Sequence, residues 1–269
     1  MTSYRYPNER LILALTVILV LAVIAVTATA TLCGSAIFVA LMLVVAFALN
    51  RVHHDDLLKS AQAVTPESLP GLARLVGECA ARLRPGKTLA YIAPGRVLNA
   101  YTFGLAEPRT VVVYAGVLGV MDEGEVRFIV GHELGHIALG HTWLNSLIGG
   151  MAGIPSPYGA AALLYFAFRW WNRACEYSAD RAGLLACGRP EKAISALVKL
   201  TGRGALSREG LQRRLASLET QDDDLGNILG EILSTHPMIV KRIHALQQYA
   251  ASAEYRALQT RLNDAMLST

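Results

Sequence analysis

An uncharged apolar run from Leu11 to Leu49 constrains the fold of this chain more than any other feature. As a single helix, its 39 residues would extend about 58 Å, nearly twice the thickness of a bilayer core. The small residues Cys33, Gly34 and Ser35 divide the run and can turn the chain. We therefore expect residues 1–60 to form a two-helix transmembrane hairpin, with spans at about 11–32 and 34–50.

The charges on either side of this hairpin predict its orientation. Arg5 and Arg10 precede it, Arg51 and Lys59 follow it, and its tip carries no charge. The positive-inside rule therefore places both ends in the cytoplasm, in a multi-pass protein of the cell inner membrane. A secretory signal peptide cleaved after Ala30 is the competing interpretation, but a second apolar run follows where a polar mature sequence would begin.

Composition and charge argue against two classes of protein. The chain is 53% hydrophobic and 17% charged, which is too apolar for an ordinary soluble domain and indicates the lipid bilayer as a partner. Its net charge of +4 is spread without a basic stripe interleaved with aromatics, so we expect no nucleic-acid partner. Its four cysteines form no C-x-x-C pair and no dense framework, which is typical of an interior location. No sequence feature predicts the oligomeric state.

A metal-binding motif, H-E-x-x-H, lies within a second apolar region at His132-Glu133-Leu134-Gly135-His136. On a helix the two histidines lie on one face, so both imidazoles can reach one ion. Glu133 points away from that ion and is placed to take a proton from an attacking water. Asp122 can cap this helix, which we expect to run from about Glu123 to His141. His141, five residues after His136, would then be rotated away and is interpreted as a helix-end residue.

A second acidic pair supplies the rest of a candidate zinc site. Glu176 and Asp180 are four residues apart and therefore share one helical face. A catalytic zinc keeps three protein ligands and one open position, so Glu176 is the expected third ligand. Asp180 can accept the second N–H of a ligating histidine and fix its tautomer. A surface pair of acids is the simpler alternative, although like charges at this spacing repel each other.

Several segments resemble, in order, the HtpX-like and CAAX-prenyl-endopeptidase family of membrane zinc metallopeptidases, which are gluzincins. They span roughly residues 65 to 245 and comprise Asn99-Ala100, Thr110–Tyr114, Gly116-Val117-Leu118, His132–His136, Glu176–Asp180, Thr235-His236-Pro237 and Arg242-Ile243. The resemblance implies a zinc metalloendopeptidase acting on proteins or peptides, with a role in membrane protein quality control. It also implies that His132, His136 and Glu176 bind one Zn²⁺ per chain and that Glu133 is the catalytic base.

The Thr235-His236-Pro237 segment is expected at the mouth of a helix, because Pro237 suits a first helical turn. From composition alone, His236 is an exposed histidine at a helix start. The resemblance implies instead that His236 stabilises the tetrahedral intermediate and that Arg242 holds this segment or the carboxylates around the site. A fourth zinc ligand is a further alternative, but it would fill the open position.

The remaining pattern predicts a mainly α protein with a small β-sheet, an α+β fold. Three short β-branched or aromatic segments, Thr88–Ala93, Val97–Phe103 and Thr110–Tyr114, predict the sheet. An edge strand beside the zinc helix can pair with an extended substrate, so Asn99 and Ala100 are candidate substrate-binding residues. Asn99 fixing a turn is the equal alternative.

Residues 61–269 are expected to form a zincin-like metallopeptidase domain, which includes a second uncharged segment. This segment, at about 142–169, is too short for two full spans and predicts an apolar helical hairpin instead. The alternative function is a membrane scaffold or sensor with a non-catalytic zinc site. Such a site normally closes with a fourth Cys or His, and no suitable residue is apparent.

Overall fold

The computed structural model describes residues 4–31, 33–148, 159–200 and 239–267, and its elements form a mainly helical fold with one small mixed sheet. In chain order they are α1 (Glu9–Ala30), α2 (Gly34–Ser60), β1 (Gln62–Ala63), α3 (Pro70–Leu83), β2 (Thr88–Ala93), β3 (Ala100–Phe103), β4 (Arg109–Tyr114), α4 (Ala115–Val120), α5 (Glu123–Ala138), α6 (His141–Ile148), α7 (Gly159–Cys187), α8 (Pro190–Leu200), α11 (Ile239–Ala251) and α12 (Ala253–Leu267). The predicted fold class is thus confirmed in its coarse form.

The sheet has the strand order β1-β2-β4-β3, with β2 and β4 parallel and the two outer strands antiparallel to their neighbours. Val111, Val112 and Val113 of the central strand β4 are all buried. Consecutive apolar residues are expected in a strand that is covered on both faces. The strand β3 forms one edge, where Ala100 is opposite Val113. All three predicted strands are present, although β3 begins at Ala100 rather than Val97.

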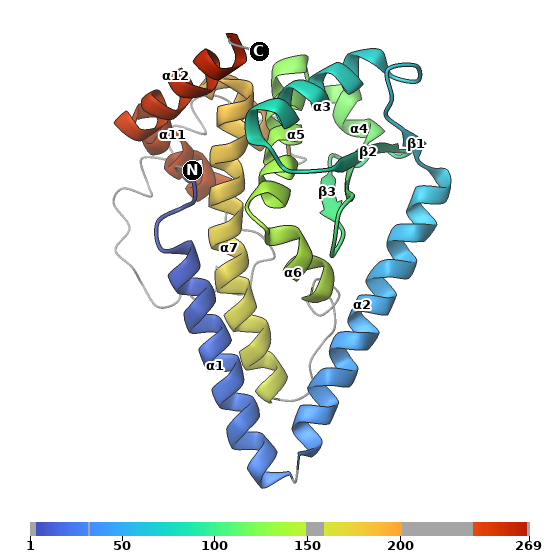
Figure 1. The fold of residues 1–269 in the computed structure, drawn as a ribbon, viewed down its shortest axis with the longest axis vertical. Helices are drawn as coiled ribbons and strands as arrows, with labels where there is room; N and C mark the ends of the chain where they lie inside the picture. Colours follow the sequence, from blue (N-terminus) through green and yellow to red (C-terminus); the bar gives the residue numbers. More distant parts are fainter. Residues whose placement is uncertain (1–3, 32, 149–158, 201–238, 268–269) are drawn as a thin grey trace.

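The helices α5 and α7 lie side by side at the centre of the molecule and pack closely against each other (Figure 1). The reason is a row of small residues on both helices. A side chain at Gly131 or Gly135 of α5 would overlap the methyl group of Ala186 or Ala182 of α7. On the other helix, a Cβ at Gly183 would lie 2.8 Å from the Phe128 carbonyl oxygen. These contacts set how near the functional side chains of the two helices can come.

The two ends of α5 show one success and one error of the sequence interpretation. Asp122 caps the helix as predicted: its Oδ1 accepts from the Glu125 N–H at 3.1 Å, and the Glu125 carboxylate accepts from the Asp122 N–H at 2.8 Å. The expected end at about His141 is wrong, because α5 stops at Ala138. Gly140 has φ 80°, a left-handed conformation that ends the helix and redirects the chain into α6.

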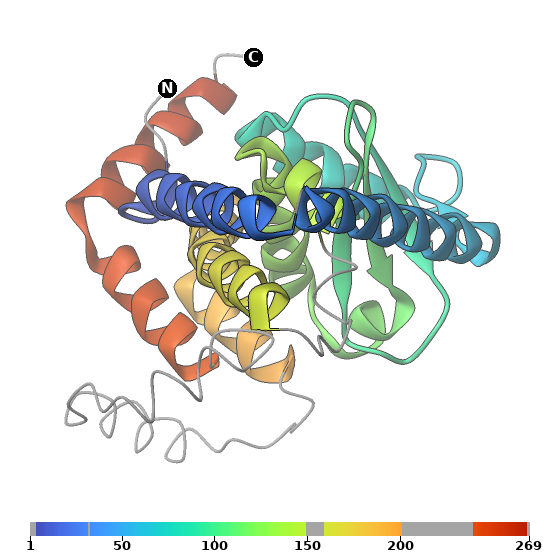
Figure 2. The same ribbon diagram turned by 90° about the horizontal axis from the view of Figure 1, so that it is seen from below.

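Among the described residues, only α1 is a helix long and apolar enough to cross a membrane. It packs along α7, and its sequence-adjacent partner α2 diverges from it in a V (Figure 1). Seen from below, α1 and α2 lie in one row across the molecule, with α7 beside α1 (Figure 2). The apolar part of α2 is shorter, so the second span of the hairpin stays a prediction.

The region expected to form the second apolar hairpin contains nearly all of α6 and about the first third of α7. The turn expected between its arms lies outside the described residues. The helix α7 continues without interruption from Gly159 to Cys187. The apolar arm and the segment that carries Glu176 and Asp180 are therefore one helix.

Candidate metal centre

Three side chains from α5 and α7 converge on one point in the interior. His132 Nε2 lies 3.2 Å from His136 Nε2 and 3.7 Å from Glu176 Oε2, and His136 Nε2 lies 3.5 Å from Glu176 Oε1. Ligands bound tetrahedrally to one zinc ion at about 2.0–2.1 Å lie about 3.3 Å from each other. The spacing of these three atoms therefore fits a single zinc ion.

The protonation of this cluster also fits a cation. His132 Nδ1 lies 3.0 Å from Asp180 Oδ1, and a carboxylate can only accept, so His132 carries its proton on Nδ1. Its Nε2 then presents a lone pair to the Glu176 carboxylate and to His136. Burial raises the pKa of Glu176, but Arg242 outweighs this effect and holds the pKa well below its ordinary value. A lone pair and a carboxylate that face one another at these distances form a site suited to a positive ion.

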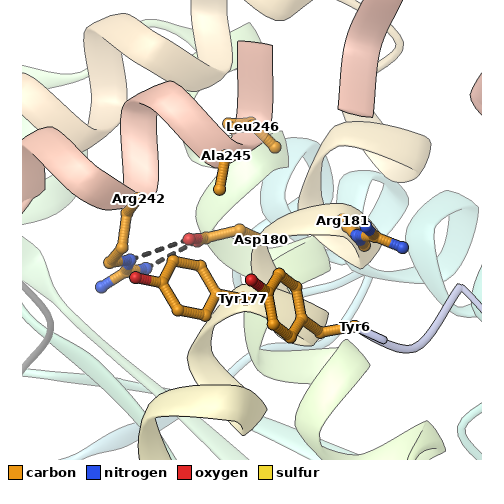
Figure 3. Close-up of a pocket in the computed structure, with 7 residues that line it drawn as sticks. All are labelled: Tyr6, Tyr177, Asp180, Arg181, Arg242, Ala245 and Leu246. Carbon is orange, nitrogen blue, oxygen red and sulfur yellow. Dashed lines mark hydrogen bonds and ion pairs between the residues drawn. The ribbon is translucent and has the colours of Figure 1, made fainter. Parts of the chain in front are cut away.

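Arg242 of α11 binds both carboxylates of α7. Its Nε donates to Asp180 Oδ2 at 2.8 Å and its Nη2 to Asp180 Oδ1 at 2.6 Å, a two-pronged contact drawn in Figure 3. Its Nη1 lies 3.0 Å from Glu176 Oε2. Burial raises the pKa of Asp180, but Arg242 lowers it by more than that. The pKa therefore lies below its ordinary value, and the carboxylate stays charged. The outer side of this pair forms a small pocket lined by Tyr6, Tyr177, Arg181, Ala245 and Leu246 (Figure 3).

Glu133 lies next to the cluster on α5 and is 7% exposed. Burial raises its pKa, which makes the carboxylate a better proton acceptor than an exposed glutamate. Neighbouring His132 and His136 oppose that rise. A buried carboxylate beside a candidate metal site, with its proton affinity raised, has the properties required of a general base.

Asn99 and Ala100 lie at the sheet edge, and His236 lies outside the described residues. The Asn99 side chain accepts from the Ala100 N–H at 3.0 Å, and the Asn99 carbonyl accepts from the Tyr114 N–H at 3.1 Å. The local contact resembles a turn-fixing role, while the position at the start of the edge strand β3 suits substrate pairing. Both interpretations of Asn99 therefore stay open.

Sequence reasoning missed two polar residues behind His136. His141 Nδ1 lies 3.0 Å from His136 Nδ1, and His141 Nε2 lies 3.1 Å from Glu9 Oε1. His141 is 1% exposed and Glu9 2% exposed. Burial lowers the pKa of His141 to about 4, so its ring is neutral at pH 7 and has one N–H to donate. Gly140 was the signal for the turn that brings His141 back, and the lone acid Glu9 before a long apolar run was the other.

Comparison with known proteins identifies a family that matches most of this chain. The family model "Peptidase family M48" matches residues 70–250. The chain is 27% identical over 216 residues to the plastoglobule-localized metallopeptidase 48 of Arabidopsis thaliana, covering 74% of this chain and 62% of that protein. It is 26% identical over 232 residues to the protease HtpX homolog of Ralstonia pickettii, covering 74% and 80%. It is 26% identical over 261 residues to the protease HtpX homolog of Moorella thermoacetica, covering 83% and 86%.

Among solved structures, the crystal structure of S. mikatae Ste24p aligns with a TM-score of 0.45 and 18% identity, covering 87% of this chain and 62% of Ste24p. The chain thus spans less than two thirds of the plastoglobule protein and of Ste24p. The M48 match extends over more than half of the chain and includes both helices that carry the three converging side chains. The resemblance inferred from the sequence is thereby confirmed, and the chain belongs to the metallopeptidases of family M48.

Proposed function

We propose that this protein is a membrane-anchored zinc-dependent endopeptidase that hydrolyses peptide bonds. One observation carries the proposal: the facing atoms of His132, His136 and Glu176 lie 3.2–3.7 Å apart with Glu133 buried beside them. No fourth Cys or His joins these three in the described part of the chain. An open fourth position distinguishes a catalytic zinc site from a structural one.

The proposed roles follow from the contacts around the cluster. His132, His136 and Glu176 hold the zinc ion, and Asp180 fixes the tautomer of His132. When bound, zinc polarises the scissile carbonyl and makes a water more acidic. Glu133 takes the proton of the attacking water and passes it to the leaving amine, so that the released amine departs neutral. Arg242 balances the charge of the Glu176 and Asp180 carboxylates.

Glu133→Gln tests this function most directly. The substitution keeps the shape of the side chain but removes its ability to accept a proton, so we expect zinc to remain bound and casein hydrolysis to be lost. The matched control is Glu123→Gln, because Glu123 lies on the same helix with a 59% exposed side chain. A Glu133→Gln protein that cleaves casein at the parental rate would show that the assignment of the base is wrong.

The scaffold or sensor alternative predicts a different response to metal removal. Chelation with 1,10-phenanthroline should abolish proteolysis of a peptidase while leaving the helical content of the chain intact. A scaffold would show no proteolysis on any unfolded or membrane substrate before chelation. Capture by Glu133→Gln, followed by identification of the co-purifying proteins, tests the proposed role in membrane protein quality control.

His236, Asn99 and Ala100 are proposed to act on the substrate. A donor from His236 to the developing oxyanion would be worth about 3 kcal/mol, or about a hundredfold in rate. In His236→Ala, full zinc content with a large fall in turnover supports this role, lost zinc supports ligation, and unchanged turnover rejects both. Asn99 and Ala100 would pair with an extended substrate through the β3 edge. An Asn99→Ala change should then raise KM for casein.

We also propose that residues 1–60 form a two-span hairpin in the cytoplasmic membrane and that residues 61–269 form a cytoplasmic peptidase domain. The V of α1 and α2 supports this topology, because the ends of both helices away from the turn lie beside the domain (Figure 1). We expect alkaline phosphatase fused after residue 60 to be inactive in a bacterial cell. Activity of that fusion would place the domain on the periplasmic side instead.

A further inference from the structure

A series of buried polar contacts connects the metal site with the start of the membrane helix α1. It runs from His136 Nδ1 to His141 Nδ1 at 3.0 Å, and from His141 Nε2 to Glu9 Oε1 at 3.1 Å. All three residues are at most 6% exposed. Glu9 belongs to the first turn of α1, so residues more than 120 positions apart in sequence meet behind one candidate ligand.

Hydrogen-bond chemistry allows one consistent arrangement of the protons. An imidazole that offers its Nε2 lone pair to a metal carries its proton on Nδ1, so His136 donates to His141 Nδ1. The neutral His141 then carries its proton on Nε2 and donates it to the Glu9 carboxylate. His136 is thereby oriented through His141 by a carboxylate, just as His132 is oriented directly by Asp180. Metal-ligating histidines generally need such a partner to fix the ring and its tautomer.

The Glu9 carboxylate is itself held on several sides. Its Oε2 accepts from the Ser178 hydroxyl, and its Oε1, which faces His141, also forms an ion pair with Arg5. Arg5 also donates to the Leu139 carbonyl at the end of α5, while the Tyr6 N–H donates to Ser178 at 2.7 Å. These contacts hold the start of α1 against α5 and α7 and leave the carboxylate little freedom to move away from His141.

We propose that Glu9 and His141 are positioning residues for the zinc ligand His136, so that the first turn of the membrane helix is a working part of the metal centre. The inference rests on the proposed zinc site. A second metal site is the competing explanation, since Glu9, His141 and Cys175 place one ligand atom each within 4.8 Å of one another. Arg5 already balances the charge of Glu9, and Ser178 and His141 already donate hydrogen bonds to its oxygens, which favours a positioning role.

The test measures zinc affinity of the full-length protein in detergent micelles by competition with a chelator of known affinity. We expect Glu9→Gln and His141→Ala each to weaken zinc binding by about 10- to 100-fold, the range found when such partners of metal ligands are removed. The double variant should bind zinc no more weakly than His141→Ala, because Glu9 acts through His141. The matched controls are Arg10→Gln and His53→Gln, whose side chains are exposed, and both should keep parental affinity.

A conservative variant separates positioning from a merely structural role. In His141→Asn the amide oxygen can replace Nδ1 as the acceptor for His136, so part of the affinity should return relative to His141→Ala. The visible spectrum of the cobalt-substituted protein should change in Glu9→Gln and His141→Ala, because it reports the geometry of the ligands.

The outcomes are distinct. Parental zinc affinity and cobalt spectrum in both single variants, with only a lower melting temperature of the metal-free chain, would overturn the inference. Additive losses in the double variant would also overturn it, as would two zinc ions in the parental chain and one in Glu9→Gln. A parental chain that binds no zinc would contradict the proposed function itself, and that result is visible before any variant is made.

Discussion

Replacing Gly135 by Ala should destabilise the protein although alanine is the better helix former. The new methyl group would overlap that of Ala182 across the α5–α7 contact. Overpacking of this kind costs about 1–3 kcal/mol, and an overlap this severe belongs at the upper end. The higher helix propensity of alanine returns about 1 kcal/mol. We therefore expect a net loss of about 2 kcal/mol, which lowers the melting temperature by about 4–8 °C in a chain near this size.

The same substitution should weaken zinc binding, because moving α7 outward displaces Glu176 from the two histidines of α5. Zinc–ligand distances tolerate only about 0.2 Å of change. The control is Gly77→Ala in α3, where a Cβ meets nothing within 4 Å. That change should raise the melting temperature by about 1–4 °C, since only the helix-propensity gain remains. Circular dichroism melts in detergent and a zinc titration measure both effects. A Gly135→Ala protein as stable as Gly77→Ala would refute the packing argument.

Three further predictions concern charge and metal. Arg242→Leu should cost about 3–5 kcal/mol by leaving the buried Asp180 and the partly buried Glu176 without this cation, whereas the exposed control Arg256→Leu should stay within about 0.5 kcal/mol by the same thermal melts. Burial raises the pKa of Glu125, but hydrogen bonds from Lys199 and Ser195 lower it by more than that, so the pKa lies below its ordinary value. The resulting stability is present above the unfolded pKa of about 4.3 and is lost as pH falls through the lower folded pKa. Glu125→Gln should therefore cost about 1.5–3 kcal/mol at pH 7, and the gap to the parental melt should narrow below about pH 4; a constant gap would contradict this. Removal of zinc by 1,10-phenanthroline should stop casein cleavage and leave the circular dichroism spectrum unchanged, with full recovery on adding zinc back.

Local patterns predicted much of this structure, and contacts between distant segments account for what they missed. The strand Thr88–Ala93 and the cap at Asp122 follow from neighbouring residues, so both were predictable. His141 was not placed correctly. The left-handed conformation of Gly140 redirects the chain there, although the apolar periodicity of the sequence continues. In the sequence, Glu9 is recognisable only as a charged residue at the edge of a predicted membrane span. Its contact with His141 depends on how α1 docks on α7, which no local pattern encodes.

Arg242 ties α11 to α7 without using the metal. Its three contacts with Asp180 and Glu176 join parts of the chain more than 60 residues apart, and they do so through charges that persist when zinc is removed. Glu176, and His132 through Asp180, are thus held near their proposed zinc-binding positions before an ion arrives. Zinc binding then has little chain entropy left to remove, because the ordering cost has been met in folding. A zinc ion bound at the proposed site should exchange as an ion entering a preorganised cavity, unlike that of a zinc finger, which folds only around its metal.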